Sequence, residues 1–308
     1  MKRMRIVLRA LAVLLLCVVG GETTGVCLGA EGGGGDAIGI VLDILKSGDQ
    51  EMQAVAIAMV KDMQGADVTK ALAKELPNLS STSQVQLLCV LGDRGDAEAL
   101  PAVVAASKGQ DESVRVAALK TIGQLGDASM ALLLAERAAA AAGQEQKAAR
   151  ESLYRLRGAG IDEAILAGIA EVQPKTRVEL ITSLGQRNVS AGVEALLKTA
   201  KDADRAVRAE SLKVLSAVAR PEQLPAIVDL LINIQTQSDR TEAEKMVAAV
   251  AHRIEKKDRR AEAVLARLPD VNDVKSRSSL LLALGRIGDN SALPVLRKEL
   301  GGKDLDVQ

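Results

Sequence analysis

The side chains that most often carry out chemistry are scarce in this sequence of 308 residues, which has one histidine and three cysteines. A histidine-dependent triad would have to use His252, and no serine or cysteine motif of a hydrolase accompanies it. One histidine, with Cys89 as the one cysteine after residue 30, cannot supply the four ligands of a zinc site. The sequence therefore predicts a protein that is not an enzyme and has no cofactor or metal.

Two other patterns are also explained without a ligand. Gly32–Gly35 lacks the Lys-Ser/Thr pair and the preceding strand of a phosphate-binding loop. The aspartates fall singly at turns, where helix capping explains them, and they lack the spacing of a calcium loop. We expect the glycines to form a linker and the aspartates to begin helices.

Arginines recur at one place of a repeated motif. The pattern Asp-x-x-Val-Arg runs from Asp111 to Arg115 and from Asp204 to Arg208, and Arg177 stands 62 residues after Arg115. These side chains could line a groove and bind an acidic partner. Stacked Asp–Arg pairs at equivalent turns would instead stabilise the array itself, and we favour this structural ladder.

The elements that position these residues form a repeat, which is complete between Asp96 and Gly126. Each half begins with an aspartate, and apolar residues then recur at three- and four-residue steps, as in an amphipathic helix. A Leu-Gly or Ile-Gly pair marks the second helix of each repeat, and the first three pairs are separated by 31 and then 62 residues, which is twice 31. The pairs are Leu91-Gly92, Ile122-Gly123, Leu184-Gly185 and Leu284-Gly285. Helices this short must stack on copies of themselves to bury their apolar sides.

A family resemblance rests on these signals and on two others. Gly-Asp recurs at Gly95, Gly126 and Gly288, and Leu-Pro begins at Leu100, Leu224 and Leu293. The pattern resembles HEAT repeats of the short, phycobilisome-lyase-like type, over most of the chain after Asp36. The resemblance implies an all-α fold, a right-handed α–α superhelix of about eight helical pairs plus an unpaired last helix, with second helices on the concave side.

The apolar periodicity places the helices, and no stretch alternates with the period of a strand. Leu119 and Leu212, four residues after Arg115 and Arg208, should point into the core. The array should be weakest at 138–143 and 158–160, where the register is lost. The predicted pairs are 37–46 with 50–63, 67–76 with 82–91, 97–107 with 112–125, 128–142 with 145–156, 163–171 with 175–184, 191–200 with 204–218, 222–234 with 239–255 and 260–267 with 274–287, followed by 290–300 alone.

The N-terminus is typical of an exported protein. Basic residues within Met1–Arg9 precede the apolar run Ala10–Val19, which is too short to cross a bilayer. We predict a signal peptide at residues 1–30, cleaved after Ala30 or Gly25, a Gly-rich linker at 31–36 and a solenoid at 37–308. Lipid attachment at Cys17 or Cys27 is less favoured. The mature chain would be periplasmic or secreted and would keep Cys89 alone, which rules out an internal disulfide; we expect a buried, inert thiol.

Composition excludes some partners. Acidic and basic residues number 40 each, and no basic stripe is visible, so we expect no nucleic acid ligand. The chain has one Tyr and neither Phe nor Trp. Small aliphatic side chains can fill the thin layer between paired helices.

The C-terminus falls inside a repeat, since Asp304–Gln308 matches the start of a second-helix motif. Leu293, Leu296 and Leu300 would then have no partner helix. We expect either that the sequence is a fragment, which we favour, or that another chain completes it.

Three functions are compatible with these features. The favoured one is a non-enzymatic scaffold that binds a protein or peptide in the bacterial envelope, with Lys120 and Lys213 as candidate partner-binding residues; the alternative role of these lysines is solubility. The second is an N-terminal accessory region of a larger secreted enzyme truncated at residue 308. A bilin lyase-like enzyme is less favoured, because export and the lack of aromatic side chains oppose it.

Overall fold

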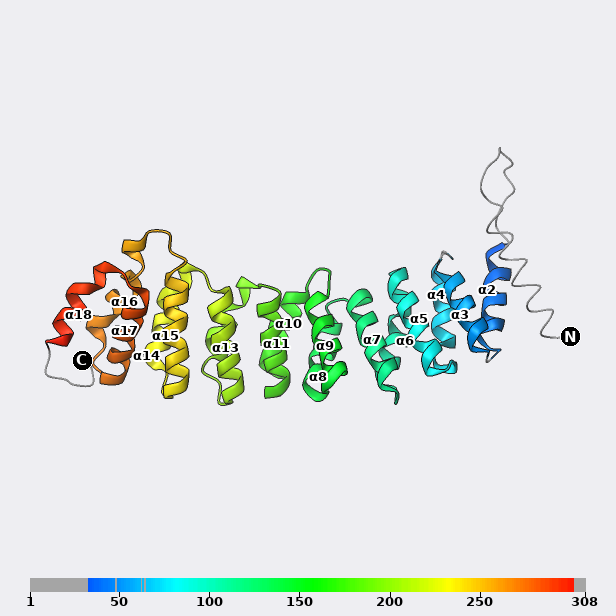
Figure 1. The fold of residues 1–308 in the computed structure, drawn as a ribbon, viewed down its shortest axis with the longest axis horizontal. Coiled ribbons are helices and arrows are strands. Elements are labelled where there is room, and N and C mark those ends of the chain that lie inside the picture. Colours follow the sequence, from blue (N-terminus) through cyan, green and yellow to red (C-terminus); the bar gives the residue numbers. More distant parts are fainter. Residues whose placement is uncertain (1–32, 48, 62, 64, 302–308) are drawn as a thin grey trace, which may run out of the picture. The chain divides into compact units, whose positions relative to one another are not determined.

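The computed structural model of the protein describes residues 33–301 except 48, 62 and 64. These residues form seventeen α-helices, short 3-10 helices and no strand (Figure 1). In this part of the chain no helix combines the length and apolar character needed to cross a membrane. The predicted signal peptide and the partial motif at Asp304–Gln308 lie outside the described residues.

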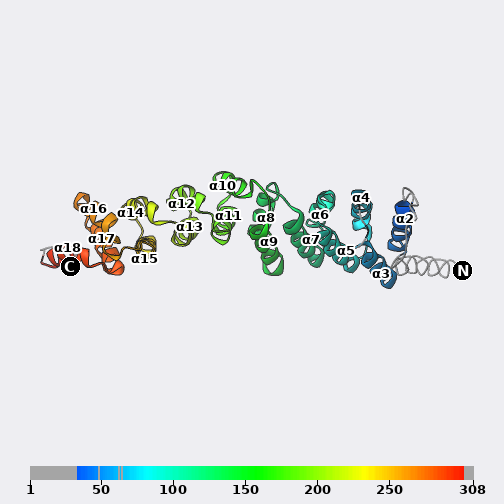
Figure 2. The same ribbon diagram turned by 90° about the horizontal axis from the view of Figure 1, so that it is seen from above.

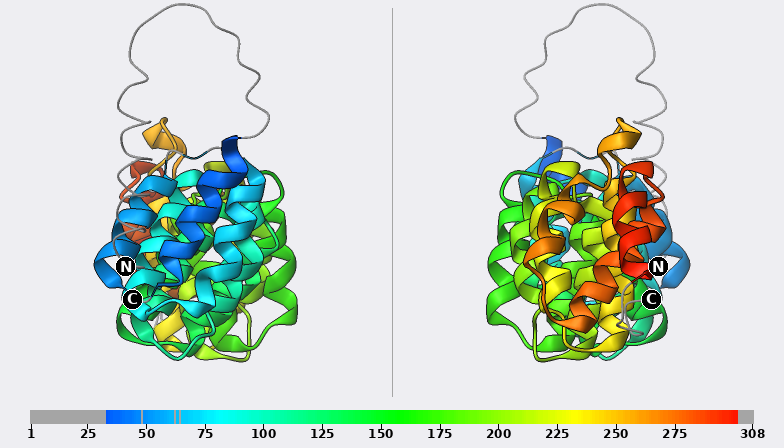
Figure 3. Two further views of the ribbon diagram at one scale, coloured as in Figure 1. Left: turned by 90° about the vertical axis from the view of Figure 1, so that its right-hand side faces the viewer. Right: turned by 90° about the vertical axis from the view of Figure 1, so that its left-hand side faces the viewer.

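The described residues form two compact units, and the first comprises residues 33–130 and 140–159. In it the second helices α3, α5, α7 and α9 each pack on the next, while α4 packs on α2 and α6. The helices of this unit form two layers (Figure 2). Helix α2, dark blue in Figure 3 (left), lies at the N-terminal end of the unit. Its helices are α2 (Gly33–Leu45), α3 (Gln50–Val60), α4 (Ala66–Glu75), α5 (Ser81–Arg94), α6 (Leu100–Ala106), α7 (Glu112–Leu125) and α9 (Gly143–Arg155).

The second unit comprises residues 131–139 and 160–301. Its second helices α11, α13, α15 and α17 stack in the same way, with α12, α14 and α16 in the other layer. Its helices are most of α8 (Met130–Ala140), then α10 (Ile161–Glu171), α11 (Pro174–Gln186), α12 (Val193–Thr199), α13 (Arg205–Val218), α14 (Leu224–Asn233), α15 (Gln237–Ala251), α16 (Glu262–Arg267), α17 (Val274–Ile287) and α18 (Leu293–Leu300).

The predicted all-α helical-repeat fold is confirmed, with every predicted helix present within a few residues of its expected bounds. The predicted pair 128–142 and 145–156 is split, because most of α8 belongs to the second unit and α9 to the first. Of the three unit boundaries, those at 139/140 and 159/160 fall at the segments expected to be weakest, and the one at 130/131 does not. The right-handed superhelix and that weakness stay predictions.

The Leu-Gly signal has a packing cause. A Cβ built on Gly123 would lie 2.8 Å from Ser152 Cα on α9, and one built on Gly185 would lie 3.1 Å from Val214 on α13. Successive second helices therefore lie in close contact at these glycines, where the first of the two helices has no side chain. The motif glycine allows this close stacking.

The turn signals also have local causes. Gly95 and Gly288 end α5 and α17 with φ of 70° and 66°, a left-handed cap that glycine adopts without strain. The following Asp96 and Asp289 each accept a hydrogen bond from the backbone N–H two residues on, at the start of a 3-10 turn. Proline then stands in the first turn of α6 and α18, where its missing N–H costs nothing.

Burial confirms the predicted helix phase. Leu119 is 0% exposed and Leu212 2% exposed, so both point into the core. At the end of the second unit, Leu293 and Leu300 of α18 (red in Figure 3, right) are exposed, as expected, while Leu296 is half-buried.

Two details differ from the sequence expectations. α2 begins at Gly33, so four residues of the predicted linker 31–36 are helical. The packing of Val41, Ile44 and Leu45 favours α2 as a whole, and such packing overrides the weak helix propensity of glycine. Cys89 is exposed, and the prediction of a buried thiol was wrong. Leu87, Leu88 and Leu91 occupy the buried side of α5, and Cys89 lies on its other side.

Candidate functional site

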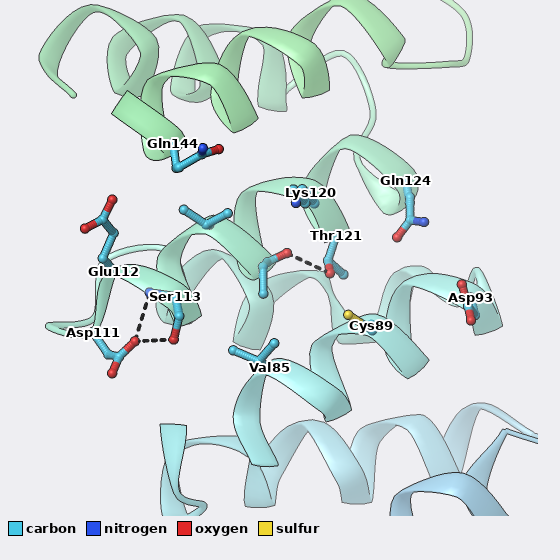
Figure 4. Close-up of a pocket in the computed structure, with 12 residues that line it drawn as sticks. Val85, Cys89, Asp93, Asp111, Glu112, Ser113, Lys120, Thr121, Gln124 and Gln144 are labelled. Carbon is cyan, nitrogen blue, oxygen red and sulfur yellow. Dashed lines mark hydrogen bonds between the residues drawn. The ribbon is translucent and has the colours of Figure 1, made fainter. Parts of the chain in front are cut away.

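A groove in the first unit lies between the second helices α5 and α7, on the side that carries the exposed Cys89 and Lys120. This α5/α7 groove has a volume of about 830 Å³. Figure 4 shows Cys89 of α5 beside Thr121 of α7, and Val85 of α5 and Lys120 of α7 also line the groove. Val116 and Ala117 of α7 add apolar surface to the groove.

The start of α7 is fixed by a cap. Asp111 Oδ1 accepts hydrogen bonds from Ser113 N at 2.9 Å, from Val114 N at 3.2 Å and from the Ser113 hydroxyl at 2.5 Å. The Ser113 hydroxyl, with further hydrogen bonds, lowers the pKa of Asp111 to about 2. A charged carboxylate therefore stabilises the N-terminus of α7 at neutral pH.

The rotation of α7 is fixed by its buried side. Because Leu119 points into the core, its neighbour Lys120 points outward. Thr121 Oγ1 lies 2.9 Å from the Leu88 carbonyl oxygen of α5 and so connects the two helices. These contacts place Lys120 and Thr121 at the α5/α7 groove.

A second cavity, the α7/α9 cavity, lies on the other side of Lys120 and has a volume of about 560 Å³. Gly123 allows the close approach of α7 and α9 at this point. Lys120 and Gln124 line this cavity as well as the groove, so the two hollows adjoin. The remaining lining comes from α9 and the turn after it, namely Glu151, Ser152, Arg155 and Arg157.

The ladder arginines are used inside the array. Arg115 donates to the carbonyls of Gly109 and Gln110 and to Glu145 of α9 at 2.9 Å. Arg208 repeats the arrangement with two preceding carbonyls and Asp239 of α15 at 2.7 Å. These guanidinium groups join the preceding turn to a carboxylate of the next repeat.

The other predicted ladder residues take related positions. Arg177 donates to the carbonyls of Ile169 and Val172 and pairs with Asp202. Asp204 caps α13 by accepting from Ala206 N and Val207 N, as Asp111 caps α7.

Sequence reasoning missed one arginine of this kind, Arg277. It donates to the carbonyls of Leu268 and Val271 and pairs with Glu299 at 2.6 Å. Arg277 follows Asp273 by the same four residues as in the Asp-x-x-Val-Arg motif, but serine replaces the valine. The Asp–Arg spacing alone would have identified it.

The two candidate lysines have different surroundings. Lys120 lines both the groove and the adjoining cavity. Lys213 is 73% exposed and its ammonium lies 3.1 Å from Glu210 on the same helix. Lys120 therefore lies at two hollows of the first unit, whereas Lys213 lies on α13 of the second unit and pairs with a carboxylate of its own helix.

The remaining chemical candidates lie apart. His252 ends α15, and its Nε2 is 3.0 Å from the Ile287 carbonyl oxygen. Cys89 lies in the wall of the α5/α7 groove. Within the described part of the chain, no cluster of three His, Cys, Asp or Glu side chains could hold a metal ion.

HEAT repeats are detected at residues 163–248, where a family model described as HEAT repeats matches the sequence. No curated protein matches the sequence. The match covers α10 to most of α15, which are the helices that hold Arg177, Asp204 and Arg208.

Several solved structures resemble the fold. Human deoxyhypusine hydroxylase is 16% identical with a TM-score of 0.38, over 83% of this chain and 97% of the hydroxylase. An engineered protein is 20% identical with a TM-score of 0.39, over 88% of this chain and 86% of its own. The complex of CpcE and CpcF of phycocyanin lyase from Nostoc is 18% identical with a TM-score of 0.36, over 84% of this chain and 100% of the matched chain. At these values the activities of the three proteins do not inform this chain.

Proposed function

We propose that the protein is a non-enzymatic scaffold or adaptor of HEAT-like repeats, exported to the bacterial envelope, which binds a segment of another protein. The observation that supports this function is the α5/α7 groove on the outward side of the second helices. Repeat proteins of this kind bind partners along the surface that successive repeats build together.

The shape and lining of the groove suit a peptide. Its volume of about 830 Å³ is within the usual range for sites that hold a ligand the size of a few residues. Val85, Val116 and Ala117 offer apolar surface, and Lys120 and Gln124 of α7 offer exposed polar groups. Asp93, Asp111 and Glu112 add carboxylates to the lining. The groove can therefore bury a small aliphatic side chain while its rim holds polar backbone or side-chain atoms.

The strength of binding should be modest. Interfaces draw most of their energy from aromatic and arginine anchors, and this chain has one Tyr and neither Phe nor Trp. Polar and charged contacts then carry a larger share, and such contacts weaken as salt rises. A transient adaptor fits these properties better than a permanent complex.

Cys89 provides a direct test, because its exposed thiol lies in the groove wall. Immobilised protein is incubated with envelope extract before and after a bulky maleimide is attached to Cys89. The Cys89→Ser variant receives the same treatment and controls for labelling at Cys17 or Cys27. We expect partners to be captured by the unlabelled protein and by the treated Cys89→Ser variant, and to be lost when Cys89 carries the label.

The opposite result is equally clear. If the labelled protein captures the same partners at the same yield, the α5/α7 groove is not the binding site. Export is tested separately by cell fractionation: retention of the full-length chain in the cytoplasm would contradict it.

A further inference from the structure

Three cations surround the α7/α9 cavity, namely Lys120, Arg155 and Arg157. All three side chains belong to exposed residues. None of them forms an ion pair with any carboxylate in the part of the chain that the structure describes. They differ in this from the ladder arginines, whose guanidinium groups are paired with Glu145, Asp202 and Asp239.

The local charge balance is positive. Glu151 is the acidic residue among those that line the cavity, and its Oε1 lies 3.9 Å from Lys147. Three positive charges around a hollow of about 560 Å³ repel one another and favour an anion between them. Arginine side chains there can also donate two parallel hydrogen bonds to one carboxylate.

The adjoining groove limits the kind of anion. Lys120 and Gln124 connect the cationic cavity to the α5/α7 groove, where Val85 and Val116 offer apolar surface. Asp93, Asp111 and Glu112 also line the groove, so an uncharged residue suits the groove and the anion belongs in the cavity. A simple phosphate would leave that surface uncovered. A nucleic acid would need a longer basic stripe and aromatic platforms, whereas acidic and basic residues are balanced at 40 each and the groove has no aromatic lining.

We propose that the α7/α9 cavity is an anion subsite that binds the carboxylate side chains of an acidic peptide segment, with an aliphatic residue of the same segment in the α5/α7 groove. This rests on the proposed scaffold function and names the chemistry of its partner. Arg155 and Arg157 bind the carboxylates, and Lys120 stands between the two subsites. The partner is thus recognised by a short acidic run beside a small aliphatic side chain.

The test is a selection of peptides by the immobilised full chain from a random decapeptide phage library. The test variant carries Lys120→Gln, Arg155→Gln and Arg157→Gln. The matched control carries Lys198→Gln, Lys245→Gln and Arg259→Gln, which removes the same charge from exposed basic residues that pair with a carboxylate three or four residues away in the sequence. Circular dichroism and thermal unfolding should be unchanged in both variants, since all six side chains lie at the surface.

We expect the wild type and the control variant to enrich Asp and Glu next to Val, Ala, Leu or Ile. The test variant should lose the acidic enrichment, and a selected acidic peptide should bind it about tenfold to a hundredfold more weakly, since each exposed charge pair contributes about two- to fivefold. Raising the salt from about 0.05 to about 0.5 M should weaken the wild type far more than the test variant.

The outcomes separate this proposal from the scaffold function. Selected peptides without acidic enrichment that are still lost on labelling Cys89 would overturn the anion subsite and leave the groove in place. Acidic peptides that survive Cys89 labelling but not the triple substitution would support the subsite and count against the groove. Equal acidic enrichment from the test and control variants, or binding of tripolyphosphate with no acidic peptide selected, would also overturn the proposal.

Discussion

The glycine at the end of each second-helix motif gives a graded test of how the repeats stack. Gly123 and Gly285 occupy the same place, the twelfth residue of the fourteen-residue helices α7 and α17. A methyl group on Gly123 would lie 2.8 Å from Ser152 Cα, whereas one on Gly285 would meet nothing within 4 Å. Alanine is therefore expected to destabilise at the first position and stabilise at the second.

The magnitude follows from two opposing contributions. Replacing a glycine inside a helix by alanine gains about 0.5–1 kcal/mol at both positions. At Gly123 the new methyl group pushes against the backbone of α9, and overpacking of this kind costs about 1–3 kcal/mol. The free energy of unfolding should thus differ between Gly123→Ala and Gly285→Ala by about 1–3 kcal/mol.

Two further glycines refine the test. At Gly185 the nearest atom is 3.1 Å away on the β-branched side chain of Val214, so the cost should be intermediate. At Gly92 the nearest atom is only 2.0 Å away, but it is the end of the flexible Gln124 side chain, which can turn aside. Gly92→Ala should therefore cost less than Gly123→Ala despite the shorter distance.

Urea unfolding monitored by circular dichroism, with hydrogen exchange to locate the change, measures these differences. Exchange should rise in α7 and α9 for Gly123→Ala and fall in α17 for Gly285→Ala. Equal effects of the same sign at both positions would refute the reasoning, because helix propensity alone would then explain the data.

Three other predictions concern the core, the ladder and the caps. Leu119→Ala and Leu212→Ala should each lower the free energy of unfolding by about 2–5 kcal/mol, and changes below about 0.5 kcal/mol would contradict their burial. Arg208→Met leaves Asp239 buried without its partner and should cost about 2–4 kcal/mol in the same measurement, whereas Lys213→Met should change stability by less than about 0.5 kcal/mol. Because the pKa of Asp111 is about 2 in the folded protein and its unfolded value is higher, its stabilising effect should be complete above about pH 4 and be lost as the pH falls toward 2. Asp111→Asn should remove that part of the acid dependence in pH titrations, and an unchanged acid transition would show that the cap is not responsible.

The helices could be predicted from the sequence because each repeats the same signals. An aspartate before a helix, a glycine after it and apolar residues at three- and four-residue steps determine where a helix lies and which side is buried. The phase at Leu119 was predictable because Ala118, Leu119 and Ile122 form one apolar side of this helix, with Lys120 and Gln124 on the opposite side. The helix at 85–91 is apolar except for Gln86, and Cys89 was wrongly placed in the core because of its apolar neighbours. Gln86 and Asp93, three residues before and four after Cys89, marked the exposed side of this helix.

The partners of the ladder were harder to predict. Arg115 pairs with Glu145 and Arg208 with Asp239, carboxylates of different length that lie outside the repeated motif. A carboxylate at any of several positions in the next repeat can reach the guanidinium group. The partner therefore has no fixed residue type or spacing that the sequence would reveal. The cationic cavity was invisible for a related reason, since Arg155 and Arg157 lie where the 31-residue register is lost.

The two sets of basic residues should therefore respond oppositely to neutralisation. A guanidinium group whose donors are occupied by carbonyls and a carboxylate has little left to offer a ligand, and its removal leaves those groups unpaired. The ladder residues Arg115 and Arg208 should thus affect stability and leave peptide binding of the folded protein unchanged. Around the α7/α9 cavity the cations are exposed and form no ion pairs with the described carboxylates, so their removal relieves repulsion without unpairing any group. Neutralising Arg155 and Arg157 should then weaken peptide binding while unfolding stays the same or shifts slightly upward. The binding site is thus identified by the basic side chains that have no ion-pair partner among the described carboxylates. The repeat motif, in contrast, contains the arginines that are paired inside the array.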